Sequence, residues 1–284
     1  MPLKNDYQRD GFVICPSLID KGTIALLREE TIVIASGGRG AINGLPEVNR
    51  VAKASNTSDA SKESALKQVL AIHFPHKISS FIKTMVHDPR IVNVLTQLVG
   101  PDVKCMQSML FVKNAGKPGQ AWHQDETFIP TEDRSLVGVW IAIDDATIDN
   151  GCLWLHPTSH VEGKLWPSRK IDDVRFDGSE ESFGWPWDSE GGVAAEVSAG
   201  SVVFFNGFTL HRSLNNRRNH GYRRALVNHY MSAQSQLPWK FGASRFAPDD
   251  YRDIVMVAGA DPYAERGFED LAQPYLRPEN KDLQ

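Results

Sequence analysis

Residues 201–205, Ser-Val-Val-Phe-Phe, form the run that most clearly indicates how this chain folds. The run is short and rich in β-branched and aromatic residues, and Gly200 and Gly207 bracket it, which is typical of a buried β-strand. Many short strands separated by Gly, Pro, Asn or Asp clusters predict a sandwich or a barrel closed on itself. Runs of the same kind recur on both sides of it, at Val103–Val112, Leu136–Ile143, Cys152–Leu155, Val193–Val197 and Arg223–Tyr230.

The first hundred residues are predicted to be mainly helical. Asp20 can cap a helix that ends at Gly37-Gly38, and Asp88, followed by Pro89, can cap a second helix that ends at Gly100. Each helix has an apolar stripe on one face, so we expect both to pack on the outside of the β core. The stripes are Ile24, Leu27, Thr31 and Ile34 in the first helix, and Ile91, Val94, Leu95 and Leu98 in the second.

We expect a single domain over residues 1–284, with a helical part of about 1–100, a β core of about 101–235 and an irregular C-terminal extension, 236–284. The last twenty residues, from Glu265, are expected to be loosely attached. The polar stretch around 56–59 is predicted to be an exposed loop. The segment Val161–Gly192 is long and polar, as lids often are, and with the loop Arg39–Ser64 it is our candidate for deciding substrate specificity.

The composition is that of a globular protein, with 41% hydrophobic and 23% charged residues and a net charge of −4. Because no long basic run is present, a nucleic-acid partner is not expected. No apolar stretch reaches membrane-spanning length, so we expect no membrane partner and no signal peptide. The three cysteines are widely spaced, which disfavours a disulfide scaffold and a thiolate zinc site and favours the cytoplasm.

The string Ala-Trp-His-Gln-Asp-Glu, residues 121–126, carries the strongest chemical signal. In an extended segment, His123 and Asp125 point to the same side while Gln124 faces away. A second histidine would complete a facial triad of two His and one carboxylate, the ligand set of a divalent first-row metal with open positions. His211 is the candidate, because it follows the strand at 202–205 and so lies at the mouth of the β core.

An open-sided iron site also needs a source of electrons for dioxygen, which a chelating keto acid supplies. Arg223 opens a predicted strand, and its planar fork is suited to hold the far carboxylate of such a keto acid. Ser213 lies two residues after His211, shares its side and could add a hydrogen bond. By the alternation of a strand, Arg223 and Arg224 point in opposite directions, so one of the two must face inward.

These residues belong to a larger set of motifs through which the sequence resembles the phytanoyl-CoA dioxygenase family of Fe(II)- and 2-oxoglutarate-dependent oxygenases. Within that family it is most similar to the phytanoyl-CoA dioxygenase domain-containing proteins. The resemblance runs from about Gly11-Phe12-Val13 to Met231-Ser232-Ala233. The motifs are Gln107-Ser108-Met109, Trp122-His123-Gln124-Asp125, Gly138-Val139-Trp140-Ile141-Ala142, Asn150-Gly151-Cys152-Leu153-Trp154, His211-Arg212-Ser213 and Gly221-Tyr222-Arg223-Arg224-Ala225.

The resemblance implies a mainly β fold with flanking helices, whose core is a double-stranded β-helix, also called a jelly roll and similar to cupins. It implies that His123, Asp125 and His211 bind Fe(II), and that O2 is a co-reactant. It further implies that 2-oxoglutarate is gripped and surrounded by Arg223, Ser213, Gln107 and Trp140. Ascorbate is expected to be needed in vitro. Because the carboxylate Asp125 is retained, the resemblance favours hydroxylation of a small organic substrate, with release of succinate and CO2.

Other functions stay open from the residues alone. The same ligands suit a zinc hydrolase, for which Glu126 is the nearest candidate base. A non-catalytic module that binds metal and 2-oxoglutarate is a further alternative. The motif Ile-Pro-Gly-Ser-His, usual in the family, reads His156-Pro157-Thr158-Ser159-His160 here, which affects only the expected pocket wall. The sequence contains no signal for the oligomeric state.

Several other residues are given ordinary structural roles. The arginines at 212, 217 and 218 are predicted to form a solvated turn, with an anion-attracting rim as the alternative. Some of the tryptophans at 166, 185 and 187 are expected to cover the pocket, since exposed tryptophan is unusual. Four histidines are predicted to be structural, with a substrate contact as the alternative: His73, His156, His160 and His229.

Overall fold

The computed structural model describes residues 2–45, 64–236 and 253–277. The exposed loop predicted around 56–59 lies outside these residues, as does most of the loop Arg39–Ser64. Helices with both ends described are α1 (Pro2–Asp10), α2 (Lys21–Ala35), α5 (Ser80–Val86) and α6 (Pro89–Val99), and residues 64–67 are helical as well. Short 3-10 turns are η2 (Pro75–Lys77), η3 (Asp125–Thr127), η4 (Ile148–Asn150) and η5 (Ala264–Arg266). Among the described residues, no helix is long and apolar enough to cross a membrane.

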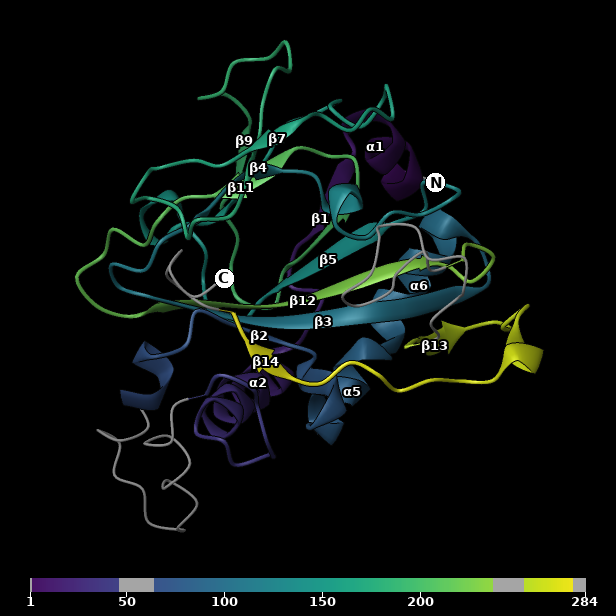
Figure 1. Cartoon of the computed structure of the whole chain (residues 1–284), viewed down its shortest axis with the longest axis horizontal. Helices are drawn as coiled ribbons and strands as arrows, with labels where there is room; N and C mark the ends of the chain where they lie inside the picture. The colour runs from purple at the N-terminus through teal and green to yellow at the C-terminus, as the bar shows by residue number, and fades with distance from the viewer. Residues whose placement is uncertain (1, 46–63, 237–252, 278–284) are drawn as a thin grey trace.

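A large antiparallel sheet runs across the middle of the molecule (Figure 1). Its strand order is β1-β10-β5-β12-β3-β2-β14, and β13 also pairs with β3. Each of the expected runs in this sheet forms a strand, so the sequence located the centre of the sheet correctly. The strands are β1 (Phe12–Cys15), β10 (Val202–Asn206), β5 (Val137–Ala142), β12 (Tyr222–Ser232), β3 (Val103–Asn114), β2 (Ala71–His73), β14 (Tyr275–Leu276) and β13 (Val255–Ala258).

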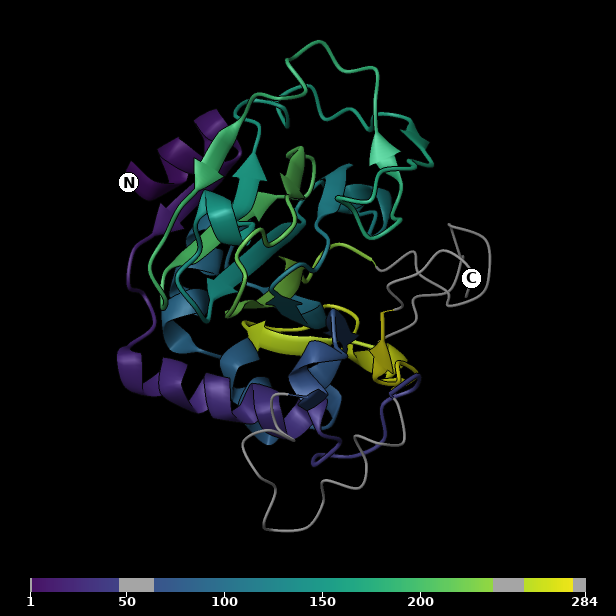
Figure 2. The same cartoon turned by 90° about the vertical axis from the view of Figure 1, so that its left-hand side faces the viewer.

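A smaller antiparallel sheet of order β4-β11-β6-β9 faces the large one (Figures 1 and 2). Apolar side chains from both sheets meet between them, among them Trp140 and Phe205 from the large sheet and Leu155 from the small one. Two facing antiparallel sheets around one core are the architecture of the predicted double-stranded β-helix. The strands are β4 (Gln120–His123), β11 (His211–Ser213), β6 (Leu153–Leu155) and β9 (Val193–Ala195); a separate hairpin pairs β7 (Ser168–Arg169) with β8 (Glu181–Ser182).

Helices cover the other face of the large sheet. Strand alternation places Trp140 between the sheets, whereas Val139 and Ile141 belong to a second apolar core that also contains Leu27 of α2 and Leu95 of α6. The predicted caps are confirmed, because Asp20 accepts a hydrogen bond from the Thr23 N–H and Asp88 accepts one from the Arg90 N–H. The helices therefore lie outside the β core, as expected, and α2 and α5 are seen below the large sheet in Figure 1.

The ends of the chain differ from the expectation in two places. Residues in the first hundred add β1 and β2 to the large sheet, beside the predicted helices. The described part of the C-terminal extension contains two short strands, because β13 pairs with β3 and β14 pairs with β2, while most of its other residues lie outside helices and strands. These strands have two to four residues each, too short for an alternating pattern to identify them, and only pairing to a longer neighbour stabilises them.

Candidate metal centre and cosubstrate cavity

Three predicted metal ligands converge at one end of the small sheet. His211 lies directly opposite His123 in the register of β11 and β4, and their ring centroids are 4.0 Å apart. Asp125 begins η3, with Gln124 between it and the end of β4, and its Oδ1 lies 3.6 Å from His123 Nε2 and 3.4 Å from His211 Nε2. One potential ligand atom from each residue lies within 4.8 Å of the other two, and all three residues are buried. The spacing of a two-His, one-carboxylate metal site is therefore present.

Both imidazoles are held in an orientation that suits metal binding. His123 Nδ1 donates to the Ala121 carbonyl oxygen at 2.7 Å, and His211 Nδ1 donates to the Thr209 carbonyl oxygen at 2.9 Å. Because a carbonyl only accepts, each Nδ1 carries a proton, and each Nε2 is directed at the common point beside Asp125 Oδ1. Burial lowers the pKa of His123 to about 3, with His211 adding to the effect, so the His123 ring is neutral.

A third histidine, His229 of β12, supports the carboxylate. Its Nε2 lies 3.0 Å from Asp125 Oδ2, leaving Oδ1 on the side of the two ligand histidines. Burial alone would raise the pKa of Asp125, but contacts with His211 and His229 hold it well below the usual range. From the sequence, a structural role for His229 is favoured over a substrate contact, and its bond to Asp125 is not foreseen. Alternation along β12 could have identified it, because Arg223 and His229 are six residues apart and so share a face.

Gln124 faces away from the metal point, as predicted. Its side-chain Nε2 donates to the Lys164 and Phe208 carbonyl oxygens, and its Oε1 accepts from the Trp166 N–H. Gln124 is fully buried. It therefore ties the strand that carries His123 to the long segment 161–192 that covers the outer face of the small sheet.

A cationic region lies in the same cavity as the triad. Arg223 of β12 is buried and its Nε donates to the Gly151 carbonyl oxygen at 3.0 Å, while its guanidinium stands 5.6 Å from the centroid of the Trp140 ring. Burial lowers the pKa of Arg223 to about 10, so it remains charged at neutral pH. Arg224 instead pairs with Asp144 on the other face, with Nε 2.8 Å from Oδ2. One arginine of the pair therefore faces the cavity and the other does not, as strand alternation predicts.

Lys113 of β3 was not foreseen at this site. It is the cross-strand partner of Arg223, it is 3% exposed, and its Nζ donates to Ser213 Oγ at 2.9 Å. Burial and the neighbouring Arg223 charge lower the pKa of Lys113 well below its usual value. The available signal was its position two residues after Phe111 and four after Met109, on the strand face that these cavity-lining residues share.

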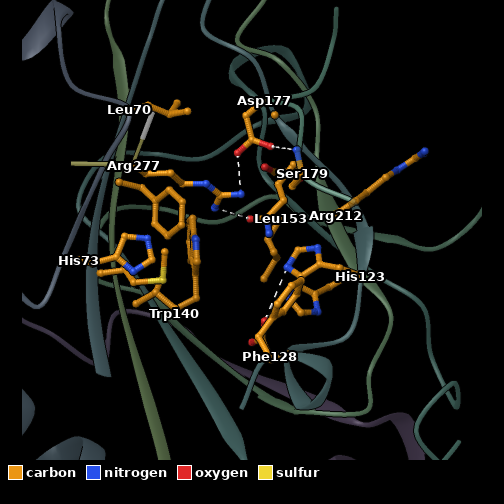
Figure 3. Close-up of a pocket in the computed structure, with 18 of the residues that line it drawn as sticks. Leu70, His73, His123, Phe128, Trp140, Leu153, Asp177, Ser179, Arg212 and Arg277 are labelled. Atoms are coloured by element: carbon orange, nitrogen blue, oxygen red, sulfur yellow. Dashed lines mark hydrogen bonds and ion pairs between the residues drawn. The ribbon is translucent and has the colours of Figure 1, made fainter. Parts of the chain in front are cut away.

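The triad and the cationic residues line one cavity of about 620 Å³. Gln107 and Trp140 also line it, as the family resemblance implies. His73, expected to be structural, lies on the wall as well (Figure 3); it stacks on Tyr275 with ring centroids 4.3 Å apart, and Gln107 Nε2 lies 3.4 Å from its Nδ1. Burial lowers the pKa of His73 to about 3, so this ring is neutral.

Two distant segments meet across another part of the cavity wall. Arg277, just after β14, extends toward Asp177 of the segment 161–192, and its Nη2 lies 2.9 Å from Asp177 Oδ2 (Figure 3). Arg277 Nη1 also donates to Gln120 Oε1 at 3.4 Å. Residues 177–180 all line the cavity, so part of the segment Val161–Gly192, our candidate for deciding substrate specificity, borders it. The C-terminal segment, in contrast, was not expected to reach it.

The tryptophans expected to cover the pocket lie elsewhere. Trp166, Trp185 and Trp187 are absent from the cavity lining and form an apolar cluster with Trp122. Alternation along β4 explains this arrangement, because Trp122 must point away from the side that carries His123. The expectation is therefore wrong: these residues shield the outer face of the small sheet.

Arg212 also differs from the expectation. It is buried rather than solvated, and its guanidinium stacks 4.7 Å from the Trp122 ring centroid and 5.5 Å from that of Trp154. Arg217 and Arg218 are exposed, as predicted for a turn. A solvated rim of three arginines does not form, because Arg212 is buried at the edge of the cavity while Arg217 and Arg218 are exposed.

Glu126 is not placed to act as a base at the metal point. It is buried, its Oε1 accepts hydrogen bonds from the Thr131 hydroxyl at 2.6 Å and from the Thr131 N–H, and it does not line the cavity. Burial raises the pKa of Glu126 to about 7. The candidate base of a zinc hydrolase is thus turned away from the site.

Comparison with known proteins identifies the family of this chain. The family model for phytanoyl-CoA dioxygenase (PhyH) matches residues 7–225, which is most of the chain. The chain belongs to the phytanoyl-CoA dioxygenase family. This is a family of iron- and 2-oxoglutarate-dependent oxygenases. Tyr275 and Arg277 of the cavity wall lie beyond the matched residues.

Individual family members are moderately similar to the chain. Phytanoyl-CoA dioxygenase domain-containing protein 1 from Rattus norvegicus is 34% identical over 169 residues, covering 57% of this chain and 56% of the rat protein. Phytanoyl-CoA dioxygenase from Arabidopsis thaliana is 30% identical over 160 residues, covering 55% of each chain. The aligned part thus spans little more than half the length of these curated relatives.

A solved structure shares the fold. The epimerase SnoN from nogalamycin biosynthesis, in complex with Fe3+, alpha ketoglutarate and nogalamycin RO, superposes with a TM-score of 0.62 and 18% identity, covering 91% of this chain and 95% of SnoN. The likeness confirms the jelly-roll architecture described above.

Proposed function

We propose that this chain is an Fe(II)- and 2-oxoglutarate-dependent dioxygenase that hydroxylates a small organic substrate. One observation carries the proposal: a buried two-His, one-carboxylate cluster shares a single cavity with a buried arginine whose guanidinium has no carboxylate partner among the described residues. The first feature suits a divalent metal with open coordination positions, and the second suits an organic acid. Family membership supports the pairing of these two ligands in one reaction.

His123, Asp125 and His211 would hold the Fe(II) ion, because all three present a ligand atom to one point and His229 steadies the carboxylate. Arg223 and Ser213 would hold the far carboxylate of 2-oxoglutarate. The Nε of Arg223 is already bonded to Gly151, which leaves its two Nη groups to form a forked pair.

When bound, Fe(II) and 2-oxoglutarate supply the reducing electrons with which O2 is split, giving succinate, CO2 and one oxygen atom for the substrate. The residues of this chain would bind and orient the metal, 2-oxoglutarate and the substrate, and would exclude water from them. Trp140 stands beside Arg223 and removes bulk water from the carboxylate end, and His73 with Tyr275 forms a neutral aromatic wall. Because this wall carries no charge, it can contact a substrate without competing for the metal or for the carboxylate of 2-oxoglutarate.

Hydroxylation is the outcome we favour because the carboxylate ligand Asp125 is present. The fold admits other outcomes, since SnoN is described as an epimerase. The cavity of about 620 Å³ must hold both 2-oxoglutarate and the substrate, which restricts the substrate to a small molecule or to one end of a larger one.

Anaerobic loading with Fe(II) and 2-oxoglutarate, followed by exposure to O2 with ascorbate present, tests the proposal. Succinate is measured by mass spectrometry across a panel of small organic acids, amines and alcohols, and 18O2 labelling of any product tests hydroxylation. We expect succinate from the unaltered chain, none from Asp125→Ala or His211→Ala, and an unchanged amount from Arg224→Gln, whose side chain faces Asp144. Binding of 2-oxoglutarate without succinate on the whole panel would favour a non-catalytic module, and turnover that is supported by Zn(II) without O2 uptake would favour a hydrolase.

A further inference from the structure

Lys113 is a buried cation without an ion-pair partner among the residues that the structure describes. It lies on β3 within the large sheet, lines the cavity and is 3% exposed. No carboxylate in residues 2–45, 64–236 or 253–277 forms an ion pair with its Nζ, and Asp177, whose charge also acts on Lys113, is already paired with Arg277. Burying an ammonium group in this way is costly unless an anion shares its surroundings.

A second cation stands directly beside it. Lys113 and Arg223 are cross-strand partners on β3 and β12, and like charges opposite each other destabilise a sheet. Arg223 is buried as well and likewise has no carboxylate partner among the described residues. Two adjacent positive charges at one end of a cavity are compensated best by a carboxylate that enters from that cavity, and such a carboxylate also favours the ammonium form of Lys113.

The hydrogen bond from Lys113 determines whether the Ser213 hydroxyl can donate to a ligand in the cavity. The ammonium group has three N–H bonds and three oxygen neighbours: the Gly151 carbonyl at 3.4 Å, the Leu214 carbonyl, and Ser213 Oγ at 2.9 Å. An ammonium group cannot accept a hydrogen bond, so Ser213 Oγ is the acceptor in this contact. The hydroxyl proton of Ser213 is then free to be donated to another acceptor, and Ser213 lines the cavity.

We propose that Lys113 is a positioning residue for the cosubstrate: it holds the Ser213 hydroxyl as a donor toward the far carboxylate of 2-oxoglutarate and adds a positive charge behind it. The inference rests on the proposed function, because it assigns a role within the 2-oxoglutarate site. It goes beyond Arg223 and Ser213 by naming the group that orients one of them.

A comparison of two ligands separates this role from a structural one. 2-Oxopentanoate has the carbon chain of 2-oxoglutarate with a methyl group in place of the far carboxylate. Binding of both ligands to Mn(II)-loaded protein is measured anaerobically by titration calorimetry for the unaltered chain, Lys113→Met, Ser213→Ala and the double variant. We expect Lys113→Met to weaken 2-oxoglutarate binding by about tenfold or more, the effect of one charge-assisted hydrogen bond, and to leave 2-oxopentanoate unchanged. In the Ser213→Ala background the same substitution should have a much smaller effect.

Lys104→Met is the matched control. Lys104 is a fully buried lysine on the same strand, its Nζ donates to the Ser235 carbonyl oxygen, and it does not line the cavity. We expect this control to lower the unfolding temperature without changing the preference for 2-oxoglutarate. If Lys113→Met does not fold, Lys113→Gln, which keeps a donor but not the charge, and Ser213→Ala carry the comparison.

Each remaining result has a definite meaning. Equal weakening of both ligands by Lys113→Met, or full additivity with Ser213→Ala, would overturn the positioning role. Unchanged 2-oxoglutarate binding in Lys113→Met would also overturn it while leaving the proposed function intact. Failure of the unaltered, metal-loaded chain to bind 2-oxoglutarate would overturn the proposed function and this inference together.

Discussion

Replacing Arg223 with glutamine removes the group that we expect to hold the far carboxylate of 2-oxoglutarate. Arg223 Nε is committed to the Gly151 carbonyl oxygen at 3.0 Å, so two Nη groups remain for the ligand. A hydrogen bond to a charged group contributes about 1.5–3 kcal/mol, so a forked pair contributes about 3–6 kcal/mol. Since 1.4 kcal/mol corresponds to a factor of ten, Arg223→Gln should weaken 2-oxoglutarate binding by about 10²–10⁴-fold.

Titration calorimetry on the Mn(II)-loaded, oxygen-free protein measures this loss directly. Arg223→Lys keeps the charge but not the fork, so we expect an affinity between those of glutamine and arginine at this position. Arg224→Gln is the neighbouring control, because its guanidinium pairs with Asp144 on the opposite face. Normal binding by Arg223→Gln, or an equal loss in Arg224→Gln, would refute the assignment of the carboxylate anchor.

Three further predictions concern the wall, a helix cap and acid stability. Asp177→Asn should break the ion pair with Arg277 and speed amide hydrogen exchange in residues 168–182 and 275–277; unchanged exchange in both segments would show that the pair does not join them. Asp88→Ala should lower the unfolding free energy by about 1 kcal/mol through loss of the α6 cap, seen as a lower denaturant midpoint, and an unshifted midpoint would contradict this. Burial tends to raise the pKa of Glu30, but hydrogen bonds from Arg39 and Ser79 lower this pKa overall. The ionised Glu30 therefore stabilises the fold above its unfolded-state pKa, and this stabilisation is lost as the pH falls through its folded-state pKa. Denaturation of Glu30→Gln from pH 7 to pH 3 should therefore show a weaker dependence on pH than the unaltered chain, and identical slopes would argue against it.

Much of the site could be predicted because it depends on local rules. His123 and Asp125 are two residues apart, and Arg223 and Arg224 are adjacent, so strand alternation constrains where each side chain points. The same alternation was not extended far enough along β12, since it also places His229 on the inner face. Lys113 was overlooked because a lysine within an apolar strand is ordinarily assigned to the solvent side.

The tryptophan cluster shows why composition alone misplaces residues. Tryptophans at 166, 185 and 187 were expected over the pocket, but the outer face of the small sheet carries Trp122 and had to be covered as well. Nothing local distinguishes these two apolar surfaces. The choice depends on which face of β4 each segment reaches, and that is settled by packing between parts of the chain that are distant in sequence.

By itself, the amino-acid sequence determined the periodic strands, the caps of α2 and α6, and the pairing of an imidazole with a carboxylate at 123 and 125, because each depends on neighbours within a few residues. Only the tertiary structure decided that His211 stands opposite His123, that Lys113 stands opposite Arg223, and that Arg277 reaches Asp177. Those contacts depend on strand register, and register is selected by the burial of whole sheet faces rather than by any short stretch of chain.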